Sequence, residues 1–147
     1  MLKSLAVVSL LLAIPTASAL AGEPGDAVRF FYANLGAETQ PENRARFTGP
    51  ALDFLNAADA AWERDETNCI EFGFAVDAQD FDDAEIERTL TLYETIEGTT
   101  AKVTAEFYNF GKATQIDWTL ENSSNGWLVS DIASAEHGWR VSSMECK

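Results

Sequence analysis

Residues 103–132, VTAEFYNFGKATQIDWTLENSSNGWLVSDI, decide the fold. Apolar and polar side chains alternate in three runs within this stretch, which is the period of a half-buried β-strand. Asn109-Phe110-Gly111 separates the first two runs, and the segment 122–126 (NSSNG) separates the last two. An Asn-Gly pair accepts the positive φ of a tight hairpin turn. The stretch therefore predicts three consecutive antiparallel strands joined by turns.

Two further extended segments precede these strands. Residues 89–96 combine β-branched and apolar side chains, and Gly98-Thr99 turns the chain into the next strand. In residues 70–76 the large apolar side chains alternate with smaller or charged ones, which predicts another strand. The acidic segment 77–83 follows it, and we expect a short helix to begin at Asp82 or Asp83.

Helical patterns fill the chain before residue 67. Asp26 is expected to cap a first helix that ends near Gly36, and a short helical turn is expected over residues 41–47. A longer helix should run from Pro50 to about Glu66. Its apolar stripe consists of Ala51, Leu52, Leu55, Ala58, Ala61 and Trp62. Helices followed by a run of strands predict an α+β domain, with N-terminal helices packed on one face of an antiparallel sheet.

The first 21 residues have the pattern of a secretory signal peptide. Lys3 precedes an apolar run over residues 5–14, and small residues offer cleavage after Ala19 or Ala21. The run is too short to span a bilayer. We expect a signal peptide at 1–21, a single domain at 22–147 that does not insert in the membrane after cleavage, and a periplasmic or secreted location.

Charge limits the classes of partner. The 147 residues include 24 Asp and Glu against 10 Lys and Arg, a net charge of −14 that becomes −15 without Lys3. Nucleic acids and anionic membrane surfaces repel such a chain. The sequence leaves a small apolar ligand or a basic protein as partner, and either a monomer or a homodimer.

The two cysteines predict a disulfide. Cys69 and Cys146 both lie after the signal segment, and an even pair in an oxidising compartment normally bonds. The bond would tie the C-terminal tail to the segment after the long helix, with a chain-entropy stabilisation of at most about 4 kcal/mol. Two cysteines and one histidine offer no zinc spacing, and no cofactor is expected.

Two motifs carry a family resemblance. The segment 77–81 (DAQDF), and the closing hairpin formed by 118–121 (WTLE) and 126–132 (GWLVSDI), resemble the DUF3828 family of exported bacterial proteins in the NTF2-like superfamily. The likeness covers roughly residues 26–134. It implies a cone in which helices pack on a curved antiparallel sheet, and an exported protein, but no activity. The tail after Ser134 has no counterpart in the family pattern.

Within that fold, the acidic segment is the first candidate site. If Phe81 were anchored in the core, it would direct Gln79 or Asp80 toward the mouth of the cone. Trp62, Trp118 and Trp127 would either line an apolar pocket or fill the core. The predicted ligand-binding residues are therefore Gln79, Asp80, Phe81, Trp118 and Trp127.

Catalytic and metal roles have few candidates. Asp80 or Asp131 could act as a general base, and His137 could do so if Asp131 or Glu136 oriented it. Asp77, Asp80 and Asp82 are hard oxygen ligands of the kind that calcium prefers. Counted from Asp77, however, the EF-hand positions five and six hold Phe81 and Asp82, so an exposed turn whose Asp side chains cap backbone donors is the alternative.

Three functions remain open. The first is a non-enzymatic binding or accessory domain for a small ligand or a protein. The second is an isomerase or hydrolase that uses a carboxylate base. The third is an acidic immunity-type antagonist of a basic protein, for which we expect a flat acidic patch built from Asp77, Asp82, Asp83 and the end of the long helix.

Overall fold

A computed structural model describes residues 23–147, and the predicted signal segment 1–21 lies outside them. No helix within 23–147 has both the length and the apolar character needed to cross a membrane. In chain order the elements are α1 (Pro24–Ala33), η1 (Ala37–Thr39), η2 (Pro41–Arg46), α2 (Gly49–Asp65), α3 (Asp83–Thr89), β1 (Thr91–Glu97), β2 (Thr100–Asn109), β3 (Lys112–Ser123), β4 (Gly126–Ser134), β5 (Trp139–Arg140) and η3 (Val141–Ser143).

The strands form one antiparallel sheet in the order β1-β2-β3-β4-β5. The three predicted strands and both turns are confirmed, and the strand predicted at 89–96 is β1. Phe110 and Gly111 have φ of 50° and 75° in the turn between β2 and β3. In the next turn Gly126 has φ of 88°, whereas Asn125 is not among the described residues with positive φ. That hairpin therefore depends on the glycine alone for its left-handed residue.

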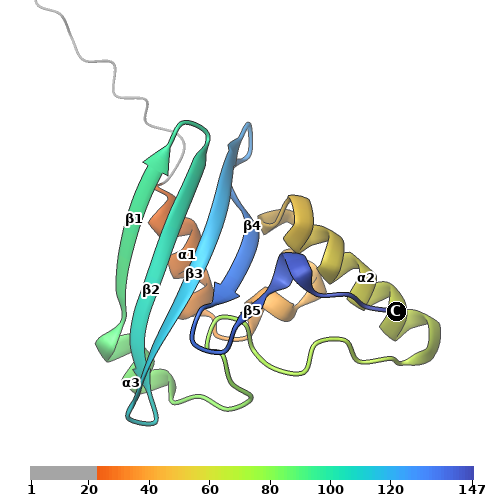
Figure 1. Ribbon diagram of the computed structural model, residues 1–147, viewed down its shortest axis with the longest axis horizontal. Coiled ribbons are helices and arrows are strands. Elements are labelled where there is room, and N and C mark those ends of the chain that lie inside the picture. The colour runs from red at the N-terminus through yellow and green to blue at the C-terminus, as the bar shows by residue number, and fades with distance from the viewer. Residues whose placement is uncertain (1–22) are drawn as a thin grey trace, which may run out of the picture.

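The helices cover one side of this sheet, so the α+β prediction is confirmed (Figure 1). Figure 1 shows α1 behind the sheet, while α2 starts beside β4 and runs away from it. α1 begins earlier than expected because Pro24 suits the first turn, so Asp26 lies inside the helix and Glu23 is the N-cap. α2 ends as predicted, where Glu66 adopts φ of 60° and its N–H donates to the Trp62 carbonyl.

Trp118 on β3 is the centre of the core. It is fully buried, stacks on Phe31 with 5.1 Å between ring centroids, and donates its indole N–H to the Tyr32 hydroxyl at 3.2 Å. The Tyr32 hydroxyl in turn donates to the Ala75 carbonyl at 3.0 Å, and burial raises the pKa of this phenol. Trp118 therefore fills the core, and this position does not fit its predicted ligand-binding role.

The strand predicted at residues 70–76 is wrong. The segment forms turns, with a single bridge between Gly73 and Ala78, and does not join the sheet. Its aromatic side chains pack on other elements: the Phe74 ring lies 6.2 Å from Phe54 of α2 and 5.7 Å from Trp139 of β5. Alternation correctly marked large buried side chains, but tertiary contacts rather than strand pairing account for their burial.

The disulfide joins Cys69 to Cys146 with 5.6 Å between the Cα atoms, which confirms that prediction. The tail between β4 and Cys146 contains β5, which pairs with β4, and η3, whose Val141 is buried. The C-terminal segment thus packs between the sheet and α2, and the bond fixes it to the segment that follows α2.

Candidate functional site

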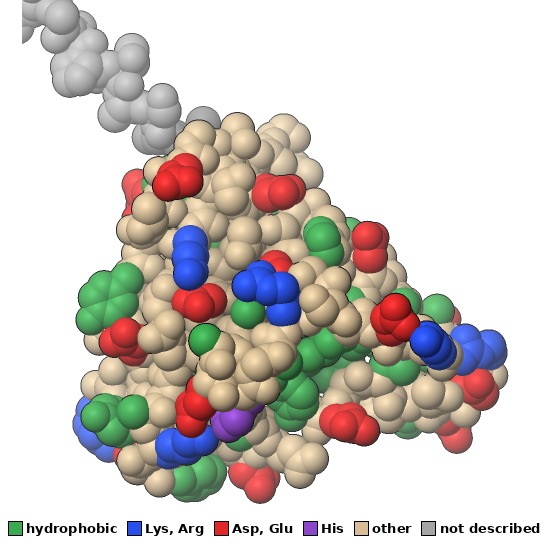
Figure 2. Space-filling model, in the orientation of Figure 1, with side chains coloured by type: hydrophobic (Ala, Val, Ile, Leu, Met, Phe, Trp, Pro, Cys, Tyr) green, Lys and Arg blue, Asp and Glu red, His purple; other side chains and the backbone are tan. Residues whose placement is uncertain are grey.

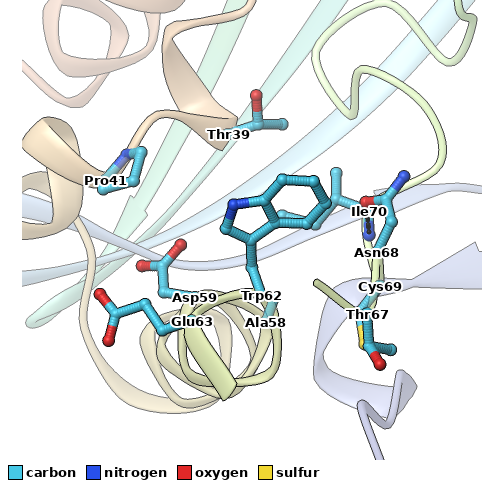
Figure 3. Close-up of a pocket in the computed structure, with 10 residues that line it drawn as sticks. All are labelled: Thr39, Pro41, Ala58, Asp59, Trp62, Glu63, Thr67, Asn68, Cys69 and Ile70. Atoms are coloured by element: carbon cyan, nitrogen blue, oxygen red, sulfur yellow. Dashed lines mark hydrogen bonds between the residues drawn. The ribbon is translucent and has the colours of Figure 1, made fainter. Parts of the chain in front are cut away.

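Trp62 stands in a surface groove at the end of α2. Its side chain is 56% exposed, although it belongs to the predicted apolar stripe. Figure 3 shows the indole ring between the Thr39–Pro41 side and the segment after α2. The groove encloses about 400 Å³, at the small end of ligand pockets, and is lined by Thr39, Pro41, Ala58, Asp59, Trp62, Glu63, Thr67, Asn68, Cys69 and Ile70. Ala58 and Ala61 of the same stripe are buried, but α2 extends past the sheet and the larger Trp62 ring at its end lies in the groove instead of the core (Figures 1 and 3).

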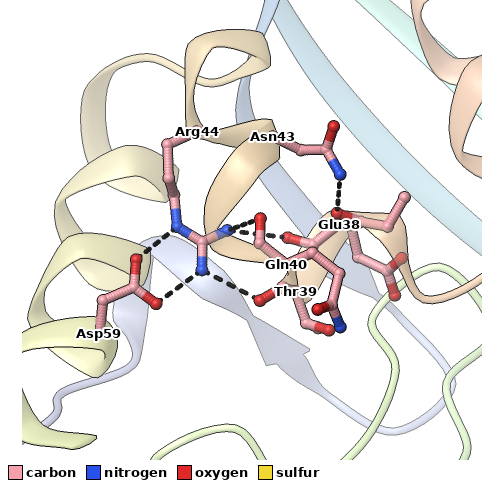
Figure 4. A network of polar contacts seen from close by, with 7 residues as sticks. Glu38, Thr39, Gln40, Asn43, Arg44 and Asp59 are labelled. Carbon is pink, nitrogen blue, oxygen red and sulfur yellow. Dashed lines mark hydrogen bonds and ion pairs between the residues drawn. The ribbon is translucent and has the colours of Figure 1, made fainter. Parts of the chain in front are cut away.

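An arginine fixes one side of this groove. Arg44 of η2 forms a bidentate ion pair with Asp59 of α2, at 2.7 and 2.8 Å. Its guanidinium also donates to the carbonyl oxygens of Glu38, Thr39 and Gln40, which are consecutive residues of the η1 region (Figure 4). Bidentate pairing and bonds to backbone carbonyls hold the η1–η2 segment against α2. The groove is therefore held open between two fixed supports, the Arg44 network and the disulfide at Cys69.

A second hollow adjoins the first. Thr39 and Ile70 line both, and the second extends past Glu38 and Glu71 to Phe81. We call the two together the Trp62 trough. Glu38 lies at its floor, fully buried, with Oε1 accepting from the Ala75 N–H at 3.2 Å and Oε2 without a hydrogen-bond partner. An orphaned carboxyl oxygen of this kind is rare in a folded protein.

Glu38 should make stability fall with rising pH. Burial raises the pKa of its carboxyl, so the folded state binds this proton more tightly than the unfolded state does. The contribution is then fully present below the unfolded pKa, near pH 4, and is lost as pH rises through the folded pKa. Glu38→Gln cannot ionise, and its stability relative to the native chain should increase by about 1–3 kcal/mol between pH 4 and pH 8.

Urea unfolding at several pH values measures that difference. Glu71→Gln is the matched control, because Glu71 is exposed in the same hollow. Its offset from the native chain should stay constant within about 0.5 kcal/mol. Equal pH slopes for Glu38→Gln and the native chain would show that Glu38 does not titrate differently on folding.

Asp77 is the organising acid of the predicted acidic segment. Its side chain is 6% exposed and accepts bonds from three groups near the end of β4 and in β5: Ser134 Oγ at 2.7 Å, Trp139 Nε1 at 2.7 Å and His137 Nδ1 at 2.5 Å. His137 is 45% exposed and pairs with neither predicted carboxylate, Asp131 nor Glu136. The Ser134 hydroxyl donates to Asp77 and not to the His137 imidazole, so the two do not form a nucleophile–base pair. The cluster instead holds the acidic segment against the end of the sheet.

Several predicted site residues share a third hollow beside that cluster. It encloses about 540 Å³ between the acidic segment and the β2–β3 turn, and Asp77, Gln79, Asp80 and His137 all line it. Asp80 contributes its carbonyl, which accepts from Asn109 Nδ2 at 3.1 Å, whereas Gln79 donates to the Glu71 carbonyl. Phe81 is 37% exposed, so the expectation that it is anchored in the core is wrong.

The remaining predicted residues lie elsewhere. Asp131 is buried and accepts from Arg140 Nη1 at 2.6 Å and from both the N–H and hydroxyl of Ser142, so it fastens the tail. Trp127 is half-buried in a hollow with residues of η2. The structure therefore does not bring the five predicted ligand-binding residues together.

The acidic segment forms neither the metal cluster nor the flat patch. Among residues 23–147 no group of three or more His, Cys, Asp or Glu side chains is placed to hold a metal ion. Asp82 instead caps α3 by accepting from the Glu85 N–H at 3.1 Å, as the alternative predicted. With Asp77 enclosed, and with α3 and the end of α2 far apart in Figure 1, the expected patch is wrong. Figure 2 shows acidic side chains dispersed over the visible face.

Comparisons with known proteins give a fold likeness. No protein-family model matches the chain, and no curated protein matches its sequence. A chain in the crystal structure of the type VI native effector–immunity complex Tae3–Tai3 from Ralstonia pickettii matches with a TM-score of 0.54 and 14% identity, over 79% of this chain and 97% of that chain. The selenomethionine form of that complex matches with a TM-score of 0.53 and 15% identity, over 77% and 97%. The likeness supports the α+β fold.

Sequence reasoning missed the trough. Trp62 was expected either to line an apolar pocket or to fill the core, it was not among the predicted ligand-binding residues, and Glu38 and Arg44 carried no role. The only sequence signal was that the apolar stripe of α2 runs to the end of the helix, where a sheet covering its first turns has ended.

Proposed function

We propose that this protein is a non-enzymatic binding domain that acts as an acidic immunity-type antagonist, covering a basic surface of another protein. The excess of surface carboxylates carries the proposal. All 24 Asp and Glu residues lie within 23–147; the carboxylates of Glu38, Asp77 and Asp131 are enclosed, while most of the others reach the surface. Only nine Lys and Arg residues lie there.

Charge complementarity is the physical basis. A surface with so many carboxylates attracts a cationic partner over several ångströms and accelerates encounter, while it rejects acidic proteins. The fold likeness to a chain of an effector–immunity complex supports the same class of function. A secretory signal at 1–21 would place the antagonist outside the cytoplasm, where the disulfide would be maintained.

The geometry supports protein binding over pocket binding. The largest aromatic side chain of the core, Trp118, is enclosed by Phe31 and Tyr32, so the site for an apolar ligand proposed beside it is already filled by protein. The described hollows lie at the surface between segments, where a partner's side chains have access.

Native mass spectrometry of the chain isolated from its source cells tests the proposal. We expect a complex with a basic protein whose activity is lost when the chain is added back to the purified partner. Because surface charge drives encounter, the association rate should fall at least tenfold between 0.05 and 0.5 M salt. A chain that carries only a small molecule, or a partner whose activity is unaffected, would contradict the proposal.

A further inference from the structure

Trp62 is a large, exposed aromatic side chain in a groove, which is the placement of an anchor residue at a protein interface. Positions 58, 59, 62 and 63 share one face of α2, so the indole continues the apolar stripe into open solvent instead of into the core. Tryptophan is seldom left this exposed, and where it is exposed at interfaces it contributes disproportionately to affinity. The ring is held in a groove whose two sides are fixed, by Arg44 and by the disulfide.

The charges beside the ring favour a cation. Asp59 is already neutralised by Arg44, but the Glu63 side chain forms no hydrogen bond or ion pair with any residue in 23–147. A free carboxylate that lines the same groove as an exposed indole suits a guanidinium, which is planar, stacks on aromatic rings and donates to carboxylates at its edge. The same kind of stacking occurs within this chain, where the Arg46 guanidinium lies 3.3 Å from the centroid of the Phe30 ring.

The shape of the trough favours an extended segment. Beyond Thr39 and Ile70 it continues to the half-exposed Phe81 and the exposed carboxylate of Glu71. An apolar and acidic track of this kind extends beyond what one side chain would fill.

We infer that the Trp62 trough binds an extended, arginine-bearing segment of the partner protein, with the guanidinium stacked on Trp62 and paired with Glu63. The inference rests on the proposed function, because it names the part of the antagonist that the basic partner contacts. Arginine rather than lysine is specified because only its planar group can use the ring face and the carboxylate together.

A peptide titration tests the site alone. The probe is the tripeptide acetyl-Gly-Arg-Gly-amide, added to the 15N-labelled chain, with the Trp62 indole resonance assigned by its loss in Trp62→Phe. We expect saturable shifts of that resonance and of the Glu63 amide. The citrulline tripeptide, which keeps the shape and removes the charge, should bind at least tenfold more weakly, as should Glu63→Gln with the arginine peptide. Equal shifts from both peptides, or shifts centred elsewhere, would overturn the inference.

The partner protein provides the second test. Trp62→Ala should weaken its binding at least tenfold, while Tyr93→Ala should change it less than threefold. Tyr93 is the matched control, since its side chain is 55% exposed but belongs to β1. Both variants should keep the thermal midpoint of the native chain, which shows that they fold. Partner binding that Trp62→Ala leaves unchanged would overturn the inference while the proposed function stands; no protein partner at all would overturn the function.

Discussion

Removal of the disulfide is expected to lower the free energy of unfolding by about 4 kcal/mol. Cys69 and Cys146 are 77 positions apart, so the bond closes a long loop and restricts the unfolded chain strongly. In the folded state both cysteines pack against the core, and Cys69 lines the Trp62 trough. The bond therefore stabilises both the domain and one side of the proposed interface.

Urea unfolding of the native chain and of the double variant Cys69→Ser/Cys146→Ser measures this effect. A reducing agent should shift the native chain to the midpoint of the variant and leave the variant unchanged, which separates loss of the bond from loss of the sulfur atoms. A loss of this size corresponds to a fall in thermal midpoint of about 10 °C or more. Coincident unfolding curves with and without reductant would refute the prediction.

Asp77→Ala is expected to cost a similar amount, about 4 kcal/mol. Ser134, His137 and Trp139 would lose their common acceptor. The buried Ser134 hydroxyl and the half-buried Trp139 indole would each lose about 1–3 kcal/mol before relaxation, whereas the exposed His137 ring can bond to water instead. Asp77 also has φ of 55°, a region that Asp and Asn tolerate better than Ala. Asp77→Asn keeps the backbone preference and one acceptor oxygen, so about 2 kcal/mol is expected for it.

Asp80→Asn is the matched control for the Asp77 variants. It makes the same chemical change three residues away, at an exposed side chain for which the structure shows no hydrogen bond within residues 23–147. Its effect on the urea midpoint should correspond to less than about 0.5 kcal/mol. Equal losses at the two positions would mean that the acidic segment acts through its total charge rather than through Asp77.

The contrast between Asp77 and Asp80 shows where sequence reasoning ends. The sequence marked an acidic segment, but the partners of Asp77 lie 57–62 residues later in the chain and no local pattern connects them. The same reasoning assigned β1 to β4 correctly, because alternation and turn residues act between neighbours in the chain. The location of the site required knowledge of which distant segments meet.

The predictions for residues 70–76 and for Trp62 are wrong for a related reason. Periodicity reports that large side chains share a face, and it is silent on what covers that face. In residues 70–76 the covering elements are α2 and the tail, so burial occurs without strand pairing. At the end of α2 the periodicity is intact and Ala61 is still buried, but the Trp62 ring is left exposed in the trough.

The position of Cys146 also sets an order of events in biosynthesis. All the strand residues precede it, and Cys69 leaves the ribosome 77 residues, or about 4–15 s, earlier. During that interval Cys69 is a nascent thiol with no second cysteine to pair with, since the sequence holds only two. Covalent closure is consequently a late maturation step, and a chain interrupted in translation before residue 146 would carry a free sulfhydryl at Cys69, beside the Trp62 trough.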